Sequence, residues 1–206
     1  MVEDQRPYHH GSLRQTLLEE GRRLLLEDGE RAVSLRELAR RAGVSHGAPQ
    51  RHFADRDALL DAIAAQGFDE LTAQLEEARS PGDMRQRLAA YARAHVAFSV
   101  ANAPLIELMF ARPGPLARSD SATSRSAARF AALGAAMFEP EDGDRFDSLP
   151  WVLAATLEGI GGLAASGRLS LERIDEVTDH AVRVLLPAVQ ERVRPPSSPA
   201  GGGRPD

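Results

Sequence analysis

Apolar residues recur at intervals of three and four along most of this chain, which is the spacing of amphipathic α-helices. The intervals predict helices over residues 12–28, 56–79, 83–101, 105–111, 120–138, 149–166 and 171–194. Turn signals rich in Gly, Pro, Asn and Asp separate them. No stretch alternates apolar and polar residues for long enough to predict a sheet. We therefore expect an all-α fold.

A shorter pattern near the N-terminus predicts two further helices. Ser34 followed three residues later by Glu37 is a capping box, so a helix is predicted to begin there. Gly43 stands where a left-handed residue would end that helix, and Ser45 can cap the next one. Two short helices joined by a tight turn, with arginines on the outside, indicate a DNA-binding helix-turn-helix.

Other residue types fall at fixed offsets around this pattern. They are Ser34, Leu38-Ala39, Ala42-Gly43-Val44-Ser45, Gly47, His52-Phe53 and Arg56. Together they resemble the N-terminal signature of the TetR family of bacterial transcriptional regulators, over residues 10–67. Gln50 stands where the family usually has Tyr, and Arg56 where it usually has Lys. The resemblance implies a three-helix DNA-binding domain, followed by the helix predicted over 56–79, whose tilt transmits ligand binding to the DNA.

The same signals divide the chain. Ser12 with Gln15 is another capping box, which predicts that the first helix opens there. The segment PPSSPAGGG has the composition of a disordered tail. We expect a flexible arm over residues 1–11, a helix-turn-helix DNA-binding domain over 12–67, a helical effector-binding and dimerisation domain over 68–194, and a disordered tail over 195–206.

Side chains of the second short helix are expected to face the major groove. Gln50 can read an adenine edge and Arg51 a guanine edge, while Gly47 lets the backbone approach closely. Helix N-termini and their capping residues suit phosphates. The candidate DNA-binding residues are Ser34, Arg36, Ser45, His46, Gly47, Gln50, Arg51, His52 and Arg56. The alternative is a helical hairpin of the same shape that binds nothing.

Charge supports DNA binding locally rather than globally. The whole chain has a net charge of −5. From Arg31 to Arg56, however, six arginines stand against only Glu37 and Asp55. A small basic domain on an acidic body is typical of a regulator.

Several classes of chemistry are excluded or disfavoured. The absence of Cys excludes disulfides, thiol catalysis and Cys-based zinc sites. His46 and His52 lie on different sides of a short helix without a carboxylate cluster, so we expect no metal, and nothing calls for a cofactor. No apolar run approaches the ~18 residues of a membrane span, and the N-terminus lacks an apolar signal region. We expect a cytoplasmic protein that binds no membrane.

Two motifs leave an enzyme open as an alternative. Residues 43–47 fit the G-x-S-x-G nucleophile elbow, but a helix precedes them where the elbow needs a strand. Residues 159–164 fit G-x-G-x-x-A, with Asp179 about twenty residues further on, as in a dinucleotide site. Close packing of helices through small residues is the favoured interpretation of the second motif.

The middle of the chain offers a candidate ligand pocket. The candidates are His95, Phe98, Asn102, Met109, Phe110, Phe130, Met137, Trp151 and Glu158. His95, Asn102 and Glu158 are the polar groups that could orient a ligand. The alternative interpretation is that these side chains form ordinary core and that His95 is a core histidine with its hydrogen bonds satisfied.

The last two helices are apolar enough to predict an interface. Residues 149–166 are almost uncharged, which predicts a helix buried on nearly all sides. Two such helices from each of two subunits would form a four-helix bundle. The candidate dimer contacts are Leu157, Gly161, Ile174, Val177, Ala181 and Leu185.

We therefore expect a homodimeric transcriptional repressor, released from a palindromic double-stranded DNA operator by a small-molecule effector. One alternative is an effector-independent or architectural DNA-binding protein. The other is an all-α enzyme with an appended helix-turn-helix domain.

Overall fold

The structure is a computed structural model that describes residues 10–79, 81–111, 121–136 and 148–192. These residues contain helices and no strand, which confirms the all-α prediction. The α-helices are α1 (His10–Asp28), α2 (Leu35–Arg41), α3 (Arg56–Glu77), α4 (Met84–Ala101), α5 (Ala103–Ala111), α6 (Ala122–Ala136), α7 (Leu149–Ala165) and α8 (Ile174–Arg192). Three short 3-10 helices are η1 (Glu30–Ala32), η2 (Pro49–Arg51) and η3 (Leu171–Arg173). The predicted disordered tail lies outside the described residues.

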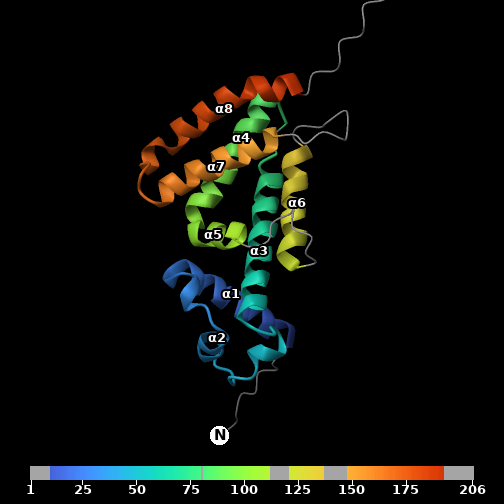
Figure 1. Cartoon of the computed structure of the whole chain (residues 1–206), viewed down its shortest axis with the longest axis vertical. Coiled ribbons are helices and arrows are strands. Elements are labelled where there is room, and N and C mark those ends of the chain that lie inside the picture. The colour runs from blue at the N-terminus through green and yellow to red at the C-terminus, as the bar shows by residue number, and fades with distance from the viewer. Residues whose placement is uncertain (1–9, 80, 112–120, 137–147, 193–206) are drawn as a thin grey trace, which may run out of the picture.

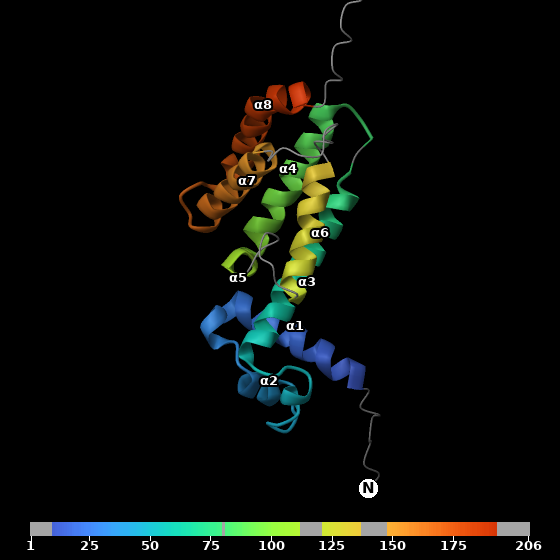
Figure 2. The same cartoon turned by 45° about the vertical axis from the view of Figure 1, so that its right-hand side comes forward.

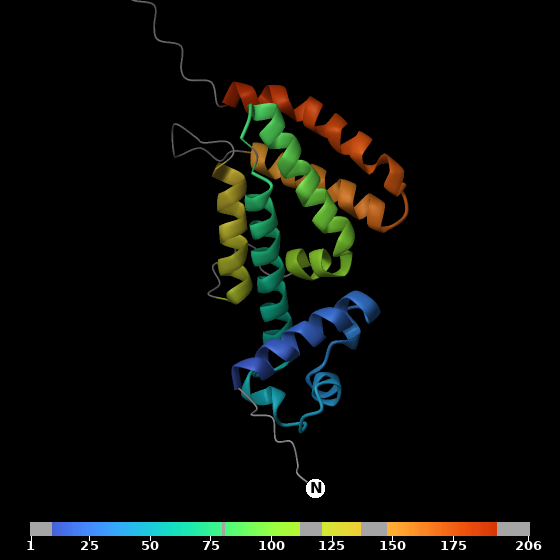
Figure 3. The same cartoon turned by 180° about the vertical axis from the view of Figure 1, so that it is seen from behind.

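The long helix α3 joins the two ends of the molecule. Its 22 residues span about 33 Å. In Figure 1 it rises from α1 and α2 at the lower end and continues into the upper part, where α6 lies beside it. Figures 2 and 3 show α4 beside α7 and α8, with α5 just above α1. One rigid element therefore belongs to both predicted domains.

Side-chain caps set the starts of α2, α3 and α4 where the sequence predicted them. The Asp55 carboxylate accepts a hydrogen bond from the amide of Ala58 at 2.8 Å, and a complete capping box between Asp83 and Gln86 opens α4. The prediction for Ser12 is wrong, because α1 already includes His10. A capping-box sequence marks the start of a helix only where the residues before it are not helical themselves.

A continuous hydrophobic cluster crosses the predicted domain boundary at residue 67, which falls inside α3. The cluster joins side chains of α1, α2 and α3 to Phe98, Leu105 and Phe130 of the following helices. Gly67 allows α5 to approach, since a Cβ there would lie 2.6 Å from Met109 Sδ. A second cluster fills the space between α4, α7 and α8.

Polar contacts also join the two ends. Arg22 of α1 donates to the Glu70 carboxylate of α3 at 2.6 Å and to the Asn102 amide oxygen at 3.0 Å, at the corner between α4 and α5. Asp61 of α3 accepts from the amide of Ala122 at 3.1 Å and from the Thr123 hydroxyl at 2.6 Å, so it anchors the start of α6. These bonds hold the α4–α5 corner against α1 and the start of α6 against α3.

Helix α7 is not buried on all sides in the single chain. Leu153, Leu157 and Ile160 are buried, whereas Trp151 and Val152 are each 46% exposed. The low charge of this helix predicted burial on nearly all sides, and that prediction is wrong for the single chain. The other helices of the chain cover only one face of α7.

No single helix among the described residues is both long and apolar enough to cross a membrane. The consecutive pair α4 and α5 would reach the required length and hydropathy only together, and it is bent by 100°.

Candidate nucleic-acid interface

Helix α2 begins as the sequence predicted. The Ser34 hydroxyl accepts a hydrogen bond from the amide of Glu37 at 3.2 Å. The reciprocal half of the capping box is not made, since the Glu37 carboxylate accepts from Arg40 and Arg41 instead. Ser34 therefore caps α2 with its side chain alone.

The turn after α2 closes in a Schellman motif. Gly43 has φ +66°, the left-handed conformation predicted for it. The amide of Val44 donates to the carbonyl of Ala39 at 3.0 Å, and the amide of Gly43 donates to the carbonyl of Arg40 at 3.3 Å. This geometry fixes the direction in which the chain leaves α2.

The second short helix departs from the prediction. Residues 46–48 form turns, and only η2 is helical, as a single 3-10 turn. Pro49 has no amide hydrogen to donate to the carbonyl of Ser45, which accepts from Ala48 at 3.0 Å instead. No side-chain capping bond opens η2, so the cap predicted for Ser45 is absent. The buried side chains of Pro49 and Phe53 hold the segment against the domain.

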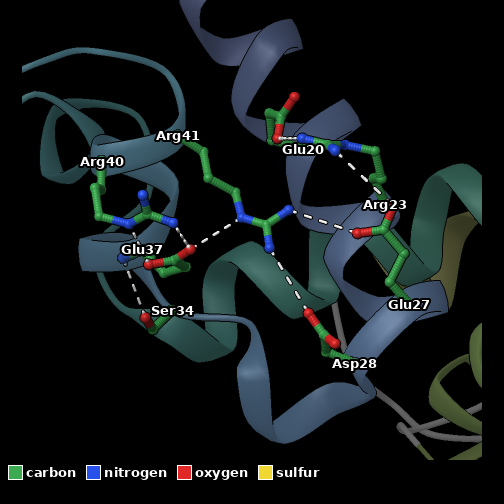
Figure 4. Close-up of polar contacts among 8 residues, drawn as sticks. All are labelled: Glu20, Arg23, Glu27, Asp28, Ser34, Glu37, Arg40 and Arg41. Carbon is green, nitrogen blue, oxygen red and sulfur yellow. Dashed lines mark hydrogen bonds and ion pairs between the residues drawn. The ribbon is translucent and has the colours of Figure 1, made fainter.

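Arg41 ties α2 to the end of α1. Its guanidinium lies 2.9 Å from Glu37 Oε1, 3.6 Å from Glu27 and 3.7 Å from Asp28 (Figure 4). Hydrogen bonds from Arg40 and Arg41 lower the pKa of Glu37 to about 2. Both arginines are thus held in local ion pairs.

Arg56 has a structural role that the sequence did not reveal. Its Nε donates to the carbonyl of Val33 at 2.8 Å, and a terminal nitrogen donates to the carbonyl of Glu30 at 2.6 Å. The side chain thereby joins the start of α3 to η1 and the extended residue after it. The side chain is still 39% exposed, and the phosphate contact expected for Arg56 stays a prediction.

The remaining candidates lie on the surface around the turn. Arg36, Ser45, His46, Gly47, Gln50 and Arg51 are exposed, while Ser34 and His52 are half-buried. Arg36, Gln50 and Arg51 make no hydrogen bond or ion pair with a described residue. Arg31 in η1 shares this property and was not singled out from the sequence, although it bounds the basic stretch.

The enzyme motifs have structural explanations. Ser45 follows α2 and its Schellman turn, not a strand. Residues 159–164 lie inside α7. The described residues contain no group of three or more His, Asp or Glu side chains placed to hold a metal ion.

The candidate pocket residues do not form one set. Phe98, Met109 and Phe130 are buried in the first cluster, and His95 is buried beside them. Asn102 is occupied by Arg22. Two of the candidates lie at the surface instead of lining an interior pocket: Phe110, 39% exposed, and Trp151, 46% exposed. Met137 lies outside the described residues.

Comparisons with known proteins agree with this geometry. A family model for bacterial regulatory proteins of the tetR family matches residues 17–63, from α1 into α3. No curated protein matches the chain. A solved structure of a protein with unknown function from Rhodococcus sp. RHA1 is 39% identical, with a TM-score of 0.75 over 89% of this chain and 98% of that one.

Two more distant structures share the fold. A TetR-family transcriptional regulator from Streptomyces coelicolor is 20% identical, with a TM-score of 0.65, covering 87% of this chain and 96% of its own. The TetR-family regulator PfmR from Thermus thermophilus is 22% identical, with a TM-score of 0.59, covering 83% and 97%. The chain belongs to the TetR family and is a DNA-binding transcriptional regulator.

Proposed function

We propose that this regulator is a repressor that binds a palindromic operator as a homodimer and is released by a small-molecule effector. The observation that carries the DNA-binding part is the contrast among polar side chains of the N-terminal domain. Arg41 and Arg56 are held by internal partners, whereas Arg36, Gln50 and Arg51 are exposed and unpaired around one turn. Unpaired donors on a rigid support suit recognition of DNA.

The candidate residues take different roles in this proposal. His46, Gln50 and Arg51 read base edges in the major groove, and Gly47 permits close approach of the backbone, with no atom within 4 Å of a Cβ built there. Arg36, Ser34, Ser45 and His52 face phosphates. Because η2 is a single short turn, most of the base contacts come from residues 46–51 rather than from a long helix.

Exposed apolar side chains support a homodimer through α7 and α8. Trp151, Val152 and Leu163 of α7 and Val184 of α8 are 40–64% exposed. Such side chains on two adjacent helices favour burial against a second copy.

The dimer contacts predicted from the sequence need correction. Leu157 is fully buried, and a Cβ on Gly161 would lie 2.6 Å from Ser99 Cβ, so both residues pack against α4 of the same chain. Ile174, Val177, Ala181 and Leu185 are half-buried against the second cluster and stay candidates only at the edge of an interface.

The contacts of Arg22 and Asp61 support release by an effector. They join α1 and α3 to the α4–α5 corner and to α6, which belong to the proposed effector-binding domain of residues 68–194. A ligand with higher affinity for one arrangement of these helices would shift the population of subunits toward it. The distance between the two DNA-binding domains would then no longer fit the operator.

The DNA-binding proposal is tested by footprinting the protein on the DNA beside its own gene and then measuring the affinity of variants. Gln50→Ala is expected to lose about 1–3 kcal/mol at one base position and to change which sequences are preferred. Gln74→Ala, an exposed glutamine near the far end of α3, is the matched control and should bind like the wild type. Unchanged binding of every site by Gln50→Ala would show that Gln50 reads no base.

The repressor part has its own test. A reporter gene placed behind the footprinted DNA should be transcribed more strongly in cells that lack the protein. Lower transcription in its absence would identify an activator.

A further inference from the structure

A cavity of about 280 Å³ lies where α1, α3 and α6 meet, and we call it the α1–α6 cavity. Its lining comes from residues 14–18, 62–69 and 122–129. Both α1 and α6 lie beside α3, and Figures 2 and 3 show the lower end of the yellow α6 just above α1. The cavity therefore straddles the predicted domain boundary at residue 67. None of the pocket residues predicted from the sequence lines it.

Short apolar side chains form one part of the lining. Leu18, Ala62 and Ala65 line the cavity, and all three are buried. The two alanines of α3 keep the space open, because longer side chains there would fill it. An engineered apolar cavity of about 150 Å³ holds benzene. The α1–α6 cavity therefore has room for the hydrocarbon part of an organic molecule with one or two rings.

Arginines from two helices form the charged part of the lining. Arg14 of α1 and both Arg125 and Arg129 of α6 line the cavity, and all three are exposed. Asp69 of α3 is the single carboxylate among the described residues of the lining. Apart from its two arginines, α6 has no charged residue. Three positive charges against one negative charge favour an anionic ligand.

Arg129 keeps donors available for such a ligand. It forms an ion pair with Asp69 and donates to the Ser126 hydroxyl at 2.9 Å. Both contacts use Nη2, so Nη1 and Nε have no hydrogen-bond partner among the described residues. The Arg129 and Asp69 side chains are 58% and 50% exposed, and ion pairs this exposed are weak. A ligand can therefore compete with Asp69 for this guanidinium.

Arg14 is oriented without an anionic partner among the described residues. Its guanidinium carbon lies 5.3 Å from the centroid of the Phe53 ring, over the ring face. It makes no hydrogen bond or ion pair with a described residue. A contact with the face of an aromatic ring leaves the N–H donors of a guanidinium available. Since Phe53 follows the proposed base-reading segment 46–51, a ligand bound to Arg14 would lie one side chain away from the support of that segment.

We propose that the α1–α6 cavity binds a small organic carboxylate with an apolar body of one or two rings. The body would pack on Leu18, Ala62 and Ala65, and the carboxylate would accept hydrogen bonds from arginines of α1 and α6. A ligand held by both helices would favour one arrangement of α1 relative to α6 and shift the population toward it. This inference rests on the proposed effector-responsive function and adds the site and the chemical class of the effector.

Three probes test the charge and the apolar body that the cavity prefers. The full chain is titrated by calorimetry near neutral pH with 2-naphthoate, its neutral analogue 2-naphthamide, and inorganic phosphate. The naphthoate should bind at least about tenfold more tightly than the amide or the phosphate. An amide that binds as tightly as the naphthoate, or no naphthoate binding at millimolar concentration, overturns the proposal. Phosphate that binds as tightly as the naphthoate overturns the organic class.

Two variants with opposite expected effects test the location. Arg129→Gln should lower naphthoate affinity at least about tenfold, because it removes a positive charge and its donors. Asp69→Asn removes the competing carboxylate and should raise naphthoate affinity at least about threefold. The control Arg85→Gln, at an exposed position of α4 outside the cavity, should change it by less than about twofold.

The variants also separate binding from folding. If either Arg129→Gln or Asp69→Asn leaves naphthoate affinity unchanged, the carboxylate is not bound in this cavity. A gain of affinity by Asp69→Asn cannot come from misfolding, so it tests the site even if Arg129→Gln does not fold. The ranking of the three probes on the wild type needs no variant.

Operator binding is measured separately by footprinting with and without the naphthoate. Operator binding by a protein that binds no naphthoate contradicts this site and leaves the DNA-binding function standing. Naphthoate binding that depends on Arg129 but leaves operator binding unchanged upholds the site and contradicts release by this ligand class.

Discussion

The imidazole of His95 lies in the core without a hydrogen-bond partner among the described residues. Burial lowers its pKa to about 4, so the ring is neutral in the folded protein at neutral pH. In the unfolded chain the ring titrates near its ordinary value of 6.5. The unfolded state therefore binds an extra proton between pH 6.5 and 4, and the folded state loses stability as the pH falls through this range.

This linkage predicts a pH-dependent stability that one substitution removes. In the wild type, the His95 contribution should reduce the free energy of unfolding by up to about 1.4 kcal/mol per pH unit below pH 6.5, flattening near pH 4. His95→Phe should lack this slope. Tyr91, whose ring lies 6.1 Å from that of His95, is present in both proteins, so the difference between the two urea-unfolding profiles isolates the histidine. Parallel profiles from pH 7 to pH 4 would contradict the prediction.

The sequence predicted the roles of site residues whose contacts are with close neighbours in the sequence. The Ser34 cap and the conformation of Gly43 follow from neighbours three or four residues away, and both are confirmed. Arg56 resembled a phosphate contact in the sequence because its partners lie 23 and 26 residues earlier. Only the tertiary structure distinguishes an arginine that supports the domain from one that is exposed for DNA.

At the scale of elements, glycines decide how closely α7 approaches its neighbours. Gly161 faces α4, where a Cβ would lie 2.6 Å from Ser99 Cβ, a distance that real Cβ atoms essentially never show. Gly162, the next residue of the same helix, has no atom within 4 Å of such a position. Ser99 Cβ cannot move without its backbone, so an added methyl group at Gly161 must separate the two helices.

These adjacent glycines predict opposite effects of one substitution. Gly162→Ala should raise the free energy of unfolding by about 0.5–1 kcal/mol, because alanine has the higher helix propensity and open space around it. Gly161→Ala should lower it by about 1–3 kcal/mol through overpacking, despite the same gain in propensity. Urea unfolding of both variants measures the difference. Equal stabilisation by the two would show that α4 and α7 are not held in close contact.

The helices themselves were largely predictable, and the exceptions have local causes. The intervals of Leu, Ile and Phe placed α3, α4, α5 and α7 within a few residues of their observed ends. The second helix of the helix-turn-helix was overestimated, because Pro49 removes a hydrogen-bond donor where a regular helix would use one. Periodicity reports which face of a helix is apolar and does not report which neighbour covers that face.

At the scale of the whole molecule, α3 and the first hydrophobic cluster make the two predicted domains mechanically continuous. The cluster includes Leu18 of α1 as well as Leu108 of α5, so the N-terminal helices have no core separate from that of the helices that follow. Helices α7 and α8 contribute instead to the second cluster, beyond α4. This arrangement leaves one face of α7 and α8 uncovered, and a second subunit is the proposed cover.

The uncovered face predicts how a single charge would change assembly. Val184 of α8 is 64% exposed in the single chain. If a second subunit covers it, Val184→Asp would bury an unpaired carboxylate and weaken the dimer by at least about 2 kcal/mol, or roughly thirtyfold in Kd. Sedimentation velocity at micromolar concentration should then show a shift from dimer toward monomer.

The matched control for this variant is Leu26→Asp, which places the same charge on an exposed apolar position of α1, away from α7 and α8. It should sediment like the wild type. A dimeric Val184→Asp would exclude this part of α8 from the interface, and a monomeric wild type would contradict the homodimer itself. Since a palindromic operator has two half-sites, the monomeric variant should also lose most of its affinity for the full operator while Leu26→Asp retains it.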